Sequence, residues 1–568
     1  MSLEVARAAD AAARPGAPGD RSSTLGLWLL LAVAWFATFS LRPVLDPDES
    51  RYAEIPREMV ATGDWVTPRL NGGKYFEKPV LQYWATATAY TIFGVSDGAS
   101  RLWTVALAFL CLPMVSGFAR AIGAAPGVAA RAPLLLAVNP YFALLGQINL
   151  LDQAFAFFCC ATLFAFVLSQ LAPRRSTAER NWMLLAWAGL ALAVLSKGIA
   201  AIALTGATLV AYMLVERDAS PLRRMHFLLG VPTFLAIAAP WFWIVQLRNP
   251  EFAGFFFVHE HFARFLTKVH RRDEPFWYFV PLLLFAILPV LGVAKRAVAL
   301  AWRDAATPAG TFKARRFLLL WCAVTVLFFS VSQSKLAPYI LPAMPPLALL
   351  LAAAITDDPR AARRAAWVVL AILCTAAIGL VVYGWRRNGA VDPSLAGWAA
   401  LALGIALLPF LAGRRGAGPE ALPGAALGLR TPWLPVALAS VIGLQALTMA
   451  YAALPPSRSA KALASAVARD AIGPDTVLFS VAQYRPSVSF YLARNLRLVA
   501  FKGELEFGIG REDLGYIDDL QSFNRIWTSS VDAVAVVDPK TYAALRDAGL
   551  PGRVLAASDG RSIVVSRR

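Results

Sequence analysis

Several acidic side chains lie close together in a polar segment that directly follows the first apolar run of the chain. Residues 46–84 of this segment read DPDESRYAEIPREMVATGDWVTPRLNGGKYFEKPVLQYW. A carboxylate such as Asp48 or Glu49 could act as a general base that deprotonates an acceptor hydroxyl as it attacks a sugar carbon. Asp48 or Asp46 also suits the start of a helix, where a negative charge is favourable. We favour a chemical role for at least one carboxylate.

Three basic residues have the properties needed to bind a phosphate leaving group. Arg51 offers a planar fork, whereas Lys78 and Lys197 offer compact point charges. Lys78 could instead extend toward lipid head groups, because Pro79 begins an apolar run. Lys197 interrupts a nearly continuous apolar stretch, so its charge needs an anionic partner. We therefore expect Lys197 to bind a ligand.

Polar residues beside later apolar segments are further candidates for the same site. Asp152 is a third candidate catalytic carboxylate, although it could equally cap the helix predicted at 153–172. Ionisable residues close to membrane spans are costly and are therefore candidates for function. The residues expected to contact the substrate are Tyr52, Tyr75, Tyr339 and Lys335.

A compact histidine cluster lies in the segment His259-Glu260-His261, in a chain that has only four histidines. With Glu77 brought near, His259 and His261 could hold a divalent metal such as zinc. Surface histidines among neighbouring phenylalanines explain the cluster better, and the segment is not an HExxH motif. We expect that no cofactor is required and that any bound zinc is a structural adjunct.

The composition predicts an integral membrane protein. Hydrophobic residues make up 58% of the 568 residues and charged residues only 16%, a balance typical of chains that span a bilayer. The net charge of +18 is explained by basic cytoplasmic loops, and no nucleic-acid partner is expected. The five cysteines lie within apolar stretches, so no disulfide framework is expected.

Thirteen apolar segments could cross the membrane. They lie near residues 24–42, 102–120, 128–147, 153–172, 181–196, 198–215, 226–247, 276–294, 316–332, 338–355, 365–384, 396–413 and 432–453. Residues 80–94 are apolar but too short to cross. As an interfacial helix on the outer side, this segment keeps the basic clusters cytoplasmic. The chain then starts inside and ends outside.

The predicted fold is a polytopic α-helical membrane protein with a small C-terminal α/β domain. Residues 1–23 are expected to form a disordered cytoplasmic head, and residues 24–454 the membrane domain. Its long outer loops are residues 43–101 and 248–275. Residues 455–568 form the extracytoplasmic domain, because strand-like and helical patterns alternate there, which predicts a largely parallel sheet.

Four strand-like runs define that C-terminal domain. They are residues 476–481, 496–501, 531–537 and 562–565. Arg485, Arg494 and Arg497 in this domain could contact an anionic lipid surface. They could equally be the solvated basic residues of a small domain.

The polar segment resembles a known family. Residues 46–84, with FGVSDGASRLW behind them, are similar to the bacterial aminoarabinose transferases of lipid A modification. These belong to the C-type membrane glycosyltransferases, as do the protein O-mannosyltransferases. The runs NPYFALLGQINLLDQAFAFF, LSKGIA and SQSKLAPYILPAMPPLALL extend the resemblance to about residue 350. A second proline expected after Lys78-Pro79 is absent, which bears on local helix geometry.

The resemblance implies an enzyme of the bacterial inner membrane whose active site faces the periplasm. It implies transfer of 4-amino-4-deoxy-L-arabinose, with inversion, from undecaprenyl phosphate to phosphate groups of lipid A. This modification gives resistance to polymyxin and cationic antimicrobial peptides. The expected partners are the lipid-linked donor, lipid A and membrane lipids, and the chain is expected to be a monomer. Because a phosphate acceptor is already anionic, the carboxylates could mainly position the ammonium group of the sugar.

Two alternatives remain open. Another polyprenyl-phosphate-dependent transferase, like the protein O-mannosyltransferases, would share the polar segment and act on a protein hydroxyl or a different glycan. A transporter of the lipid-linked sugar is less favoured. Transporters show internal symmetry and polar groups near the midplane, whereas no halves match here and the polar residues gather toward one face.

Overall fold

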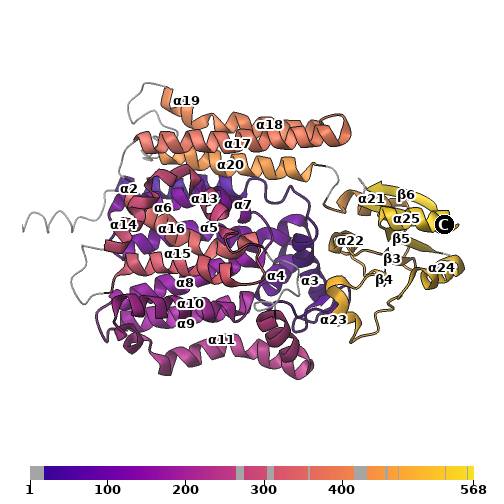
Figure 1. Cartoon of the computed structure of the whole chain (residues 1–568), viewed down its shortest axis with the longest axis horizontal. Coiled ribbons are helices and arrows are strands. Elements are labelled where there is room, and N and C mark those ends of the chain that lie inside the picture. The colour runs from indigo at the N-terminus through magenta and orange to yellow at the C-terminus, as the bar shows by residue number, and fades with distance from the viewer. Residues whose placement is uncertain are drawn as a thin grey trace, which may run out of the picture.

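The computed structural model shows a bundle of helices joined to a small α/β domain that follows it in the sequence (Figure 1). The structure describes residues 18–263, 274–303, 312–355, 359–414, 432–454, 458–470, 472–530, 532–558 and 561–567. Most of the head predicted as disordered, residues 1–17, lies outside the described residues. Helix α2 begins at Pro18, within the predicted head, and the predicted boundary at residue 23 stays a prediction.

A helix covers each apolar segment that was predicted to span the membrane. In the first half these helices are α2 (Pro18–Phe36), α5 (Asp97–Ala121), α6 (Pro126–Val138), α8 (Leu151–Leu171), α9 (Thr177–Lys197), α10 (Ala200–Glu216) and α11 (Phe227–Arg248). In the second half they are α13 (Phe279–Ile287), η3 (Leu288–Val293) and α14 (Ala294–Arg303), which run on as one unit, then α15 (Ala314–Val331), η4 (Ala337–Ala343) with α16 (Met344–Ala354), α17 (Pro359–Asn388), α18 (Pro393–Ala406), α19 (Leu408–Arg414) and α20 (Trp433–Ala452).

Within the described residues, nine helical stretches are long and apolar enough to cross a membrane. Three further apolar helices are shorter, at Leu25–Phe36, Pro126–Val138 and Ala200–Glu216. These findings agree with a multi-span membrane protein. The count of thirteen spans stays a prediction.

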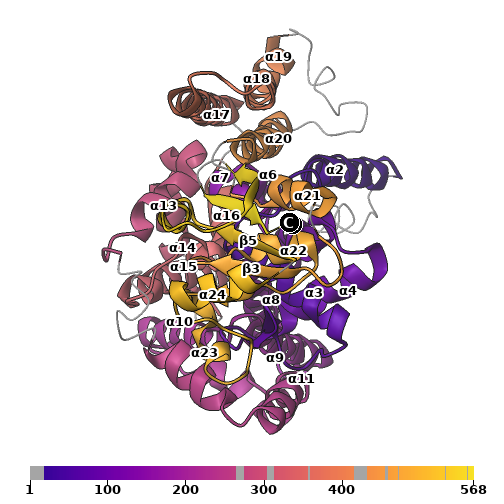
Figure 2. The same ribbon diagram turned by 90° about the vertical axis from the view of Figure 1, so that its right-hand side faces the viewer.

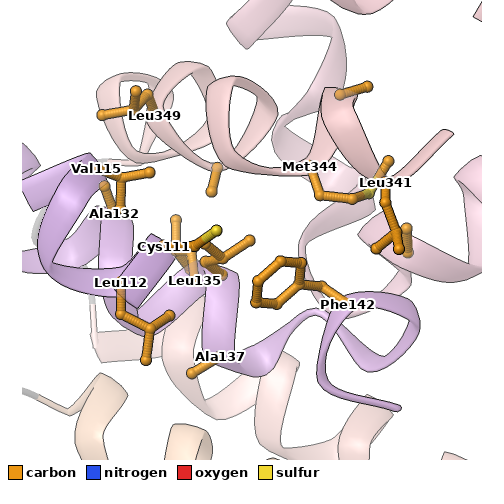
Figure 3. Close-up of a cluster of buried hydrophobic side chains, with 14 of the residues drawn as sticks. Cys111, Leu112, Val115, Ala132, Leu135, Ala137, Phe142, Leu341, Met344 and Leu349 are labelled. Atoms are coloured by element: carbon orange, nitrogen blue, oxygen red, sulfur yellow. The ribbon is translucent and has the colours of Figure 1, made fainter. Parts of the chain in front are cut away.

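The centre of the bundle is closely packed where α5 and α6 meet α7 (Pro140–Leu145), η4 and α16 (Figure 3). Small residues allow helices to approach closely in a membrane protein. Gly189 of α9 illustrates this, because a Cβ atom there would lie only 2.7 Å from Oγ1 of Thr162 on α8. The tight contact between α8 and α9 fixes the relative positions of Asp152 and Lys197, which these two helices carry.

Residues 43–101, which keep the name first outer loop from their predicted position, form an ordered layer between the bundle and the C-terminal domain (Figure 1). It contains α3 (Asp48–Thr62), the antiparallel hairpin of β1 (Arg69–Leu70) and β2 (Gly73–Lys74), and α4 (Leu81–Phe93). Helix α4 confirms the helix predicted at residues 80–94. Helix α3 is buried along most of its length although it carries five acidic or basic side chains from Glu49 to Glu58. The buried charges of α3 must therefore be paired.

The C-terminal domain is a five-stranded sheet with the order β4-β3-β5-β7-β6, which faces the viewer in Figure 2. The strands are β3 (Val477–Val481), β4 (Arg497–Val499), β5 (Ala533–Val537), β6 (Arg553–Ser558) and β7 (Ser562–Ser566). The helices around it are α21 (Lys461–Asp470), α22 (Pro486–Leu492), η7 (Gly503–Leu505), α23 (Glu506–Ile509), α24 (Leu520–Ser529) and α25 (Pro539–Asp547).

The prediction of a largely parallel sheet is wrong for one half of this sheet. Strand β3 pairs in parallel with β4 and β5, whereas β7 is antiparallel to both β5 and β6. Strand β6 was not recognised in the sequence. Residues 559–561 alone separate β6 from β7, and so short a connection can join only antiparallel strands.

The C-terminal domain is fastened to the first outer loop by buried hydrogen bonds. The Asp46 carboxylate accepts hydrogen bonds from Arg485 Nε at 2.9 Å and from Ser487 Oγ at 2.6 Å. Asn71 donates to the Leu496 carbonyl oxygen at 2.8 Å and accepts from the Leu496 amide at 2.7 Å. Arg485 therefore holds two domains together, and its buried position fits neither of the two alternatives that the sequence left open, an anionic surface or solvent.

The other two arginines considered for an anionic surface also bind within the domain. Arg494 donates hydrogen bonds to the carbonyl oxygens of Gly473 and Thr476. Arg497 donates to the carbonyl oxygen of Gly515 at 2.6 Å. These contacts stabilise loops of the α/β domain.

Candidate active site

Helix α3 brings the first group of candidate residues to the junction of the two domains. It starts at Asp48, has two carboxylates in its first turn and ends at Gly63, whose φ of 72° lies in the left-handed region. Residues three and four positions apart share one face of a helix. Asp48, Arg51 and Tyr52 therefore lie on one face, and Glu49 is turned about 100° from Asp48 around the helix axis.

Glu49 is enclosed by basic groups. Its carboxylate accepts hydrogen bonds from Arg42 at 2.7 and 2.8 Å and from Arg101 at 2.9 and 3.1 Å. The backbone N–H of Asn149 donates a further hydrogen bond to the Glu49 carboxylate at 3.0 Å. Burial would raise the pKa of Glu49, but Arg101 and Arg42 outweigh burial and hold the pKa well below its usual range. We call these groups the Glu49 cluster.

Arg51 is held between two carboxylates. Its Nη1 lies 3.1 Å from Asp48 Oδ1, and its Nη2 lies 2.5 Å from Oε2 of Glu504, on η7 of the C-terminal domain. The Arg51 side chain is buried, whereas that of Asp48 is 46% exposed. Sequence reasoning missed Glu504, because about 450 residues separate it from α3 and its local sequence carries no signal. We call Asp48, Arg51 and Glu504, with the adjacent Glu77, the Arg51 cluster.

Two tyrosines line the Arg51 cluster. Burial raises the pKa of Tyr75, and Glu77 and Glu504 add to the rise against the opposing charge of Arg51. Burial raises the pKa of Tyr83 in the same way, with the same three charges acting on it. Both phenols therefore stay protonated at neutral pH and can donate hydrogen bonds to an anion.

Lys78 contacts protein groups on two sides. Its Nζ donates to the Glu77 carbonyl oxygen at 2.8 Å and lies 3.7 Å from Oε2 of Glu260. Glu260 is buried within the π-helix η2 (Gly254–Ala263), so this contact joins the second long outer loop to the first. These contacts disfavour the alternative in which Lys78 extends to lipid head groups. Glu260 was seen in the sequence only as part of the histidine cluster.

The second group of candidates meets between α8, α9 and η4. Lys197 forms an ion pair with Asp152, and its Nζ lies 3.7 Å from the centre of the Tyr339 ring. The anionic partner that the buried charge of Lys197 needs is Asp152 in this structure, and the ligand-binding role of Lys197 stays a prediction. Asp152 is not a helix cap, because Leu150 occupies the N-cap position of α8. Lys335 is buried and donates to the carbonyl oxygen of Ser332, within its own loop.

Tyr52 connects the two groups. Burial raises its pKa, and the charges of Arg51, Asp48 and Asp152 all act on it. Its ring centre lies 6.2 Å from that of Tyr83. Tyr52 therefore brings the candidates on α3 close to Asp152 on α8, and through Asp152 to Lys197 at the end of α9.

A cavity of about 1200 Å³ opens beside this site. Its polar end is formed by Arg42, Asp46, Asp48, Glu49 and Arg458. Apolar residues of α7, α13, η3, α17 and α20 form the remaining wall, which includes Leu144, Ile148, Phe285, Leu288, Trp367, Ile372, Leu380, Leu444 and Leu447. The cavity exceeds the usual range for small-molecule pockets. An apolar chain could lie along it with an anionic or sugar group near Asp48.

The residues proposed for a metal do not form a closed zinc site within the described part of the chain. A structural zinc site needs four nitrogen, sulfur or oxygen ligands. No three His, Cys, Asp or Glu side chains converge to hold a metal among the described residues. His259 instead stacks on Phe255 and lies 3.3 Å from Glu260. The side chain of His261 lies outside the described residues.

Fold and site together define a multi-span membrane protein in which a large apolar cavity ends at alternating acids and cations. Residues 25–256 match the family model described as dolichyl-phosphate-mannose-protein mannosyltransferase, and residues 463–567 match the aminoarabinose transferase C-terminal domain. A curated relative, the undecaprenyl phosphate-alpha-4-amino-4-deoxy-L-arabinose arabinosyl transferase of Aeromonas salmonicida, is 35% identical over 384 residues, 63% of this chain and 68% of the relative.

Solved structures support the same relationship. The crystal structure of ArnT from Cupriavidus metallidurans bound to undecaprenyl phosphate is 32% identical to this chain. It superposes with a TM-score of 0.82 over 96% of this chain and 98% of that one. The apo structure of that protein gives a TM-score of 0.81 at 31% identity. The chain belongs to the aminoarabinose transferase family, and its fold is that of the C-type membrane glycosyltransferases.

Proposed function

We propose that this protein transfers 4-amino-4-deoxy-L-arabinose from undecaprenyl phosphate to phosphate groups of lipid A at the periplasmic face of the inner membrane. The observation that carries the proposal is the position of Asp48, which forms an ion pair with Arg51 and also lines the apolar cavity. A lipid-linked sugar phosphate needs an apolar path for its chain, cations for its phosphate and acids for its amino sugar. All three meet at the start of α3.

In this proposal the reaction is a direct displacement with inversion. An oxygen of the acceptor phosphate attacks the anomeric carbon, and the bond from that carbon to the phosphate oxygen of the donor breaks. The departing undecaprenyl phosphate keeps the electron pair of that bond. Cations that are already in place stabilise the charge that develops on the leaving oxygen. The acceptor is already an anion, so the step needs no general base.

The proposed roles follow from the contacts. Arg51 and Lys78 bind the donor phosphate, and Lys197 stabilises the same charge from the side of α9. Asp48 and Asp152 contact the sugar or the acceptor. The substrate-contacting candidates Tyr52, Tyr75 and Tyr339 donate hydrogen bonds at the cavity, and the buried Lys335 holds its loop. Glu49, whose oxygens are already bound by Arg42 and Arg101, is proposed as a structural residue that stabilises the start of α3.

A second candidate function is protein glycosylation, because residues 25–256 match the mannosyltransferase family model. Such an enzyme would move a sugar from a polyprenyl phosphate to a protein hydroxyl. The shared region includes α3, Lys78, Asp152 and Lys197, but it ends before the C-terminal domain. The aminoarabinose transferase C-terminal domain matches residues 463–567, and this match favours the aminoarabinose assignment.

The proposal is tested by mass spectrometry of lipid A from cells that carry or lack this chain. With the chain present and the donor supplied, lipid A gains the mass of one or more pentosamines, and deletion removes that gain. Resistance to polymyxin rises and falls with the same signal. An unchanged lipid A spectrum, together with a glycosylated protein that depends on the chain, would support the protein-directed alternative instead.

Membrane orientation has its own test. We propose that α3, η2 and the C-terminal domain lie on the periplasmic side. A tag placed after Arg568 should react with membrane-impermeant reagents once the outer membrane is opened. A tag that reacts only after the inner membrane is broken would contradict both the orientation and the thirteen-span count.

A further inference from the structure

Glu504 is presented to the site by a rigid part of the C-terminal domain. It lies in the short helix η7, next to Leu505, which is buried in the same apolar cluster as Tyr75. The ring of Phe507 lies 5.8 Å from that of Phe76 and 4.1 Å from that of Phe255. These aromatic contacts fix the segment against both long outer loops. The position of Glu504 is therefore set by packing as well as by its ion pair with Arg51.

As defined here from the described residues, the Arg51 cluster holds three carboxylates and one guanidinium group. Arg51 contacts Asp48 and Glu504, and Glu77 is close enough for its charge to act on Glu504. Three carboxylates thus surround one guanidinium group. Burial raises the pKa of Glu504, which indicates that its negative charge is costly at this place. Donor phosphate would add further negative charge unless the donor also brought a positive group.

Two buried polar atoms beside these charges are available to a ligand. Within the described part of the chain, Nε of Arg51 and the hydroxyl of Tyr83 have no hydrogen-bond partner. Tyr83 is fully buried, and the charges of Arg51, Glu77 and Glu504 all act on it. Unsatisfied buried polar groups are uncommon and costly. A donor that places an anion at Arg51 and Tyr83 would satisfy both atoms.

We propose that Glu504, brought by the C-terminal domain, is a specificity-determining residue that binds the ammonium group of the donor sugar. This inference rests on the proposed function. When donor phosphate takes over Arg51, Glu504 loses the cation that neutralises it. A buried carboxylate left without a partner is strongly unfavourable. An ammonium group on the sugar replaces the lost cation, whereas a hydroxyl group cannot, so the exchange selects for the amino sugar.

The experiment compares two donors, undecaprenyl phosphate carrying 4-amino-4-deoxy-L-arabinose and the same lipid carrying L-arabinose, with purified protein and lipid A. The wild type should show a KM for the amino donor about 10- to 100-fold lower than for the hydroxyl donor. Glu504→Gln should raise the KM for the amino donor by about the same factor and leave that for the hydroxyl donor nearly unchanged. The preference between donors should therefore collapse.

Glu512→Gln is the matched control. Glu512 also belongs to the C-terminal domain and binds the first outer loop, with its Oε2 2.9 Å from Arg69 Nη1 and 3.0 Å from the Lys74 amide. It lies outside the Arg51 cluster, so its loss tests docking alone. The control should keep the wild-type preference between the two donors. A control that loses this preference as Glu504→Gln does would overturn the proposal, because docking would then explain both.

Other outcomes also decide the matter. An equal loss with both donors would show that Glu504 only positions Arg51, and would overturn the specificity role. Equal KM values for the two donors in the wild type would overturn it without any variant, which covers the case in which Glu504→Gln does not fold. A wild type that transfers neither sugar to lipid A would contradict the proposed function itself, and this result is distinct from a failure of selectivity alone.

Discussion

Asp48 and Glu49 are neighbours in the chain, yet the structure gives them opposite surroundings. The side chain of Glu49 is 2% exposed and bound by two arginines, whereas that of Asp48 is 46% exposed and shares one arginine with Glu504. Successive residues of a helix point about 100° apart. One turn of α3 can therefore place a carboxylate that two arginines enclose next to one that stays exposed, and both line the polar end of the cavity.

The two clusters also differ in the balance of their charges. The Glu49 cluster has two guanidinium groups for one carboxylate, and its hydrogen bonds are made within the protein. The Arg51 cluster has one guanidinium group for three carboxylates. Both clusters carry an excess of one charge, but among the described residues only the Arg51 cluster has a buried arginine nitrogen without a hydrogen-bond partner, Arg51 Nε, whereas Glu49, Arg42 and Arg101 have none. Charged groups that are fully hydrogen-bonded stabilise a fold, whereas an unsatisfied buried donor among further charges is suited to a charged ligand. The difference distinguishes a structural centre from a binding site in adjacent residues.

The largest effect is expected at the Glu49 cluster. Glu49→Gln would leave Arg42 and Arg101 buried without their anion, and breaking a buried ion pair in this way costs about 3–5 kcal/mol. The free energy of unfolding in detergent should fall by that amount or the protein should fail to accumulate. Asp48→Asn, one residue away, should change it by less than about 1 kcal/mol. Equal destabilisation by the two variants would contradict the separation of the clusters.

Lowering the pH should remove the stabilisation that the Glu49 cluster gives the wild type. The pKa of Glu49 in the folded protein is held below its ordinary value of 4.5 by Arg101 and Arg42, although burial acts in the opposite direction. The stabilisation is therefore complete above about pH 4.5 and is lost as the pH falls toward the lower, folded-state pKa. Unfolding measured between pH 3 and 7, about the range accessible in detergent, should show this loss in the wild type. Glu49→Gln should lack this part of the pH dependence.

The next effect concerns the ion pair between α8 and α9. Asp152→Ala and Lys197→Ala each leave a buried charge unpaired, and each should lower the rate of transfer on the order of a hundredfold or more. Single-turnover transfer with purified protein measures this loss. Glu179→Gln is a suitable control, because Glu179 pairs with Arg224 at the other end of α9. Near-normal transfer by both pair variants at normal expression would mean that the site is misplaced.

A smaller effect is expected where the C-terminal domain meets the first loop. Asp46→Asn weakens the bonds from Arg485 and Ser487, which should cost about 1–3 kcal/mol of docking free energy. Hydrogen exchange of α22 should become faster while the rest of the bundle is unchanged. Asp547→Asn removes an exposed ion pair with Arg546 and should leave exchange unaffected. Unchanged exchange in Asp46→Asn would show that the domains are held elsewhere.

The smallest effect is expected on removal of metal. Cations already contact the Arg51 cluster, and the described residues around His259 pair with each other. Transfer after exhaustive chelation, with the metal content measured separately, should therefore stay near that of the untreated protein. Complete loss that a single metal restores would make the ion catalytic.

Much of the fold and part of the site could be predicted from the sequence. Apolar length marked the helices of the bundle, and charge between apolar stretches marked Asp152 and Lys197, which do form a pair. The polar segment at 46–84 was recognised, but not which of its carboxylates is enclosed by arginines. Asp48 and Glu49 are adjacent carboxylates that the sequence alone cannot distinguish. The structure distinguishes them, because Arg101 on α5 binds Glu49.

Other residues could not be predicted for a physical reason. Glu504 and Glu260 reach Arg51 and Lys78 from segments far away in the sequence, and a lone glutamate on a surface-like segment gives no local signal. Arginines are mostly solvent-exposed, so the sequence predicts an exposed Arg485. In the structure Arg485 is buried by its ion pair with Asp46. Hydrophobic periodicity in the sequence indicates which face of an element is buried. The ion-pair partner of a side chain depends on how elements far apart in the sequence pack together.

The most direct test of the account measures transfer and unfolding together for Asp48→Asn and Glu49→Gln. The account predicts that Asp48→Asn unfolds like the wild type but loses on the order of a hundredfold in single-turnover transfer of the amino sugar. Glu49→Gln should unfold far more readily, and the fraction that remains folded at low temperature should keep most of its transfer rate. The opposite pattern, with Asp48→Asn active and folded Glu49→Gln inactive, would contradict the assignment of the site to the Asp48 face of α3.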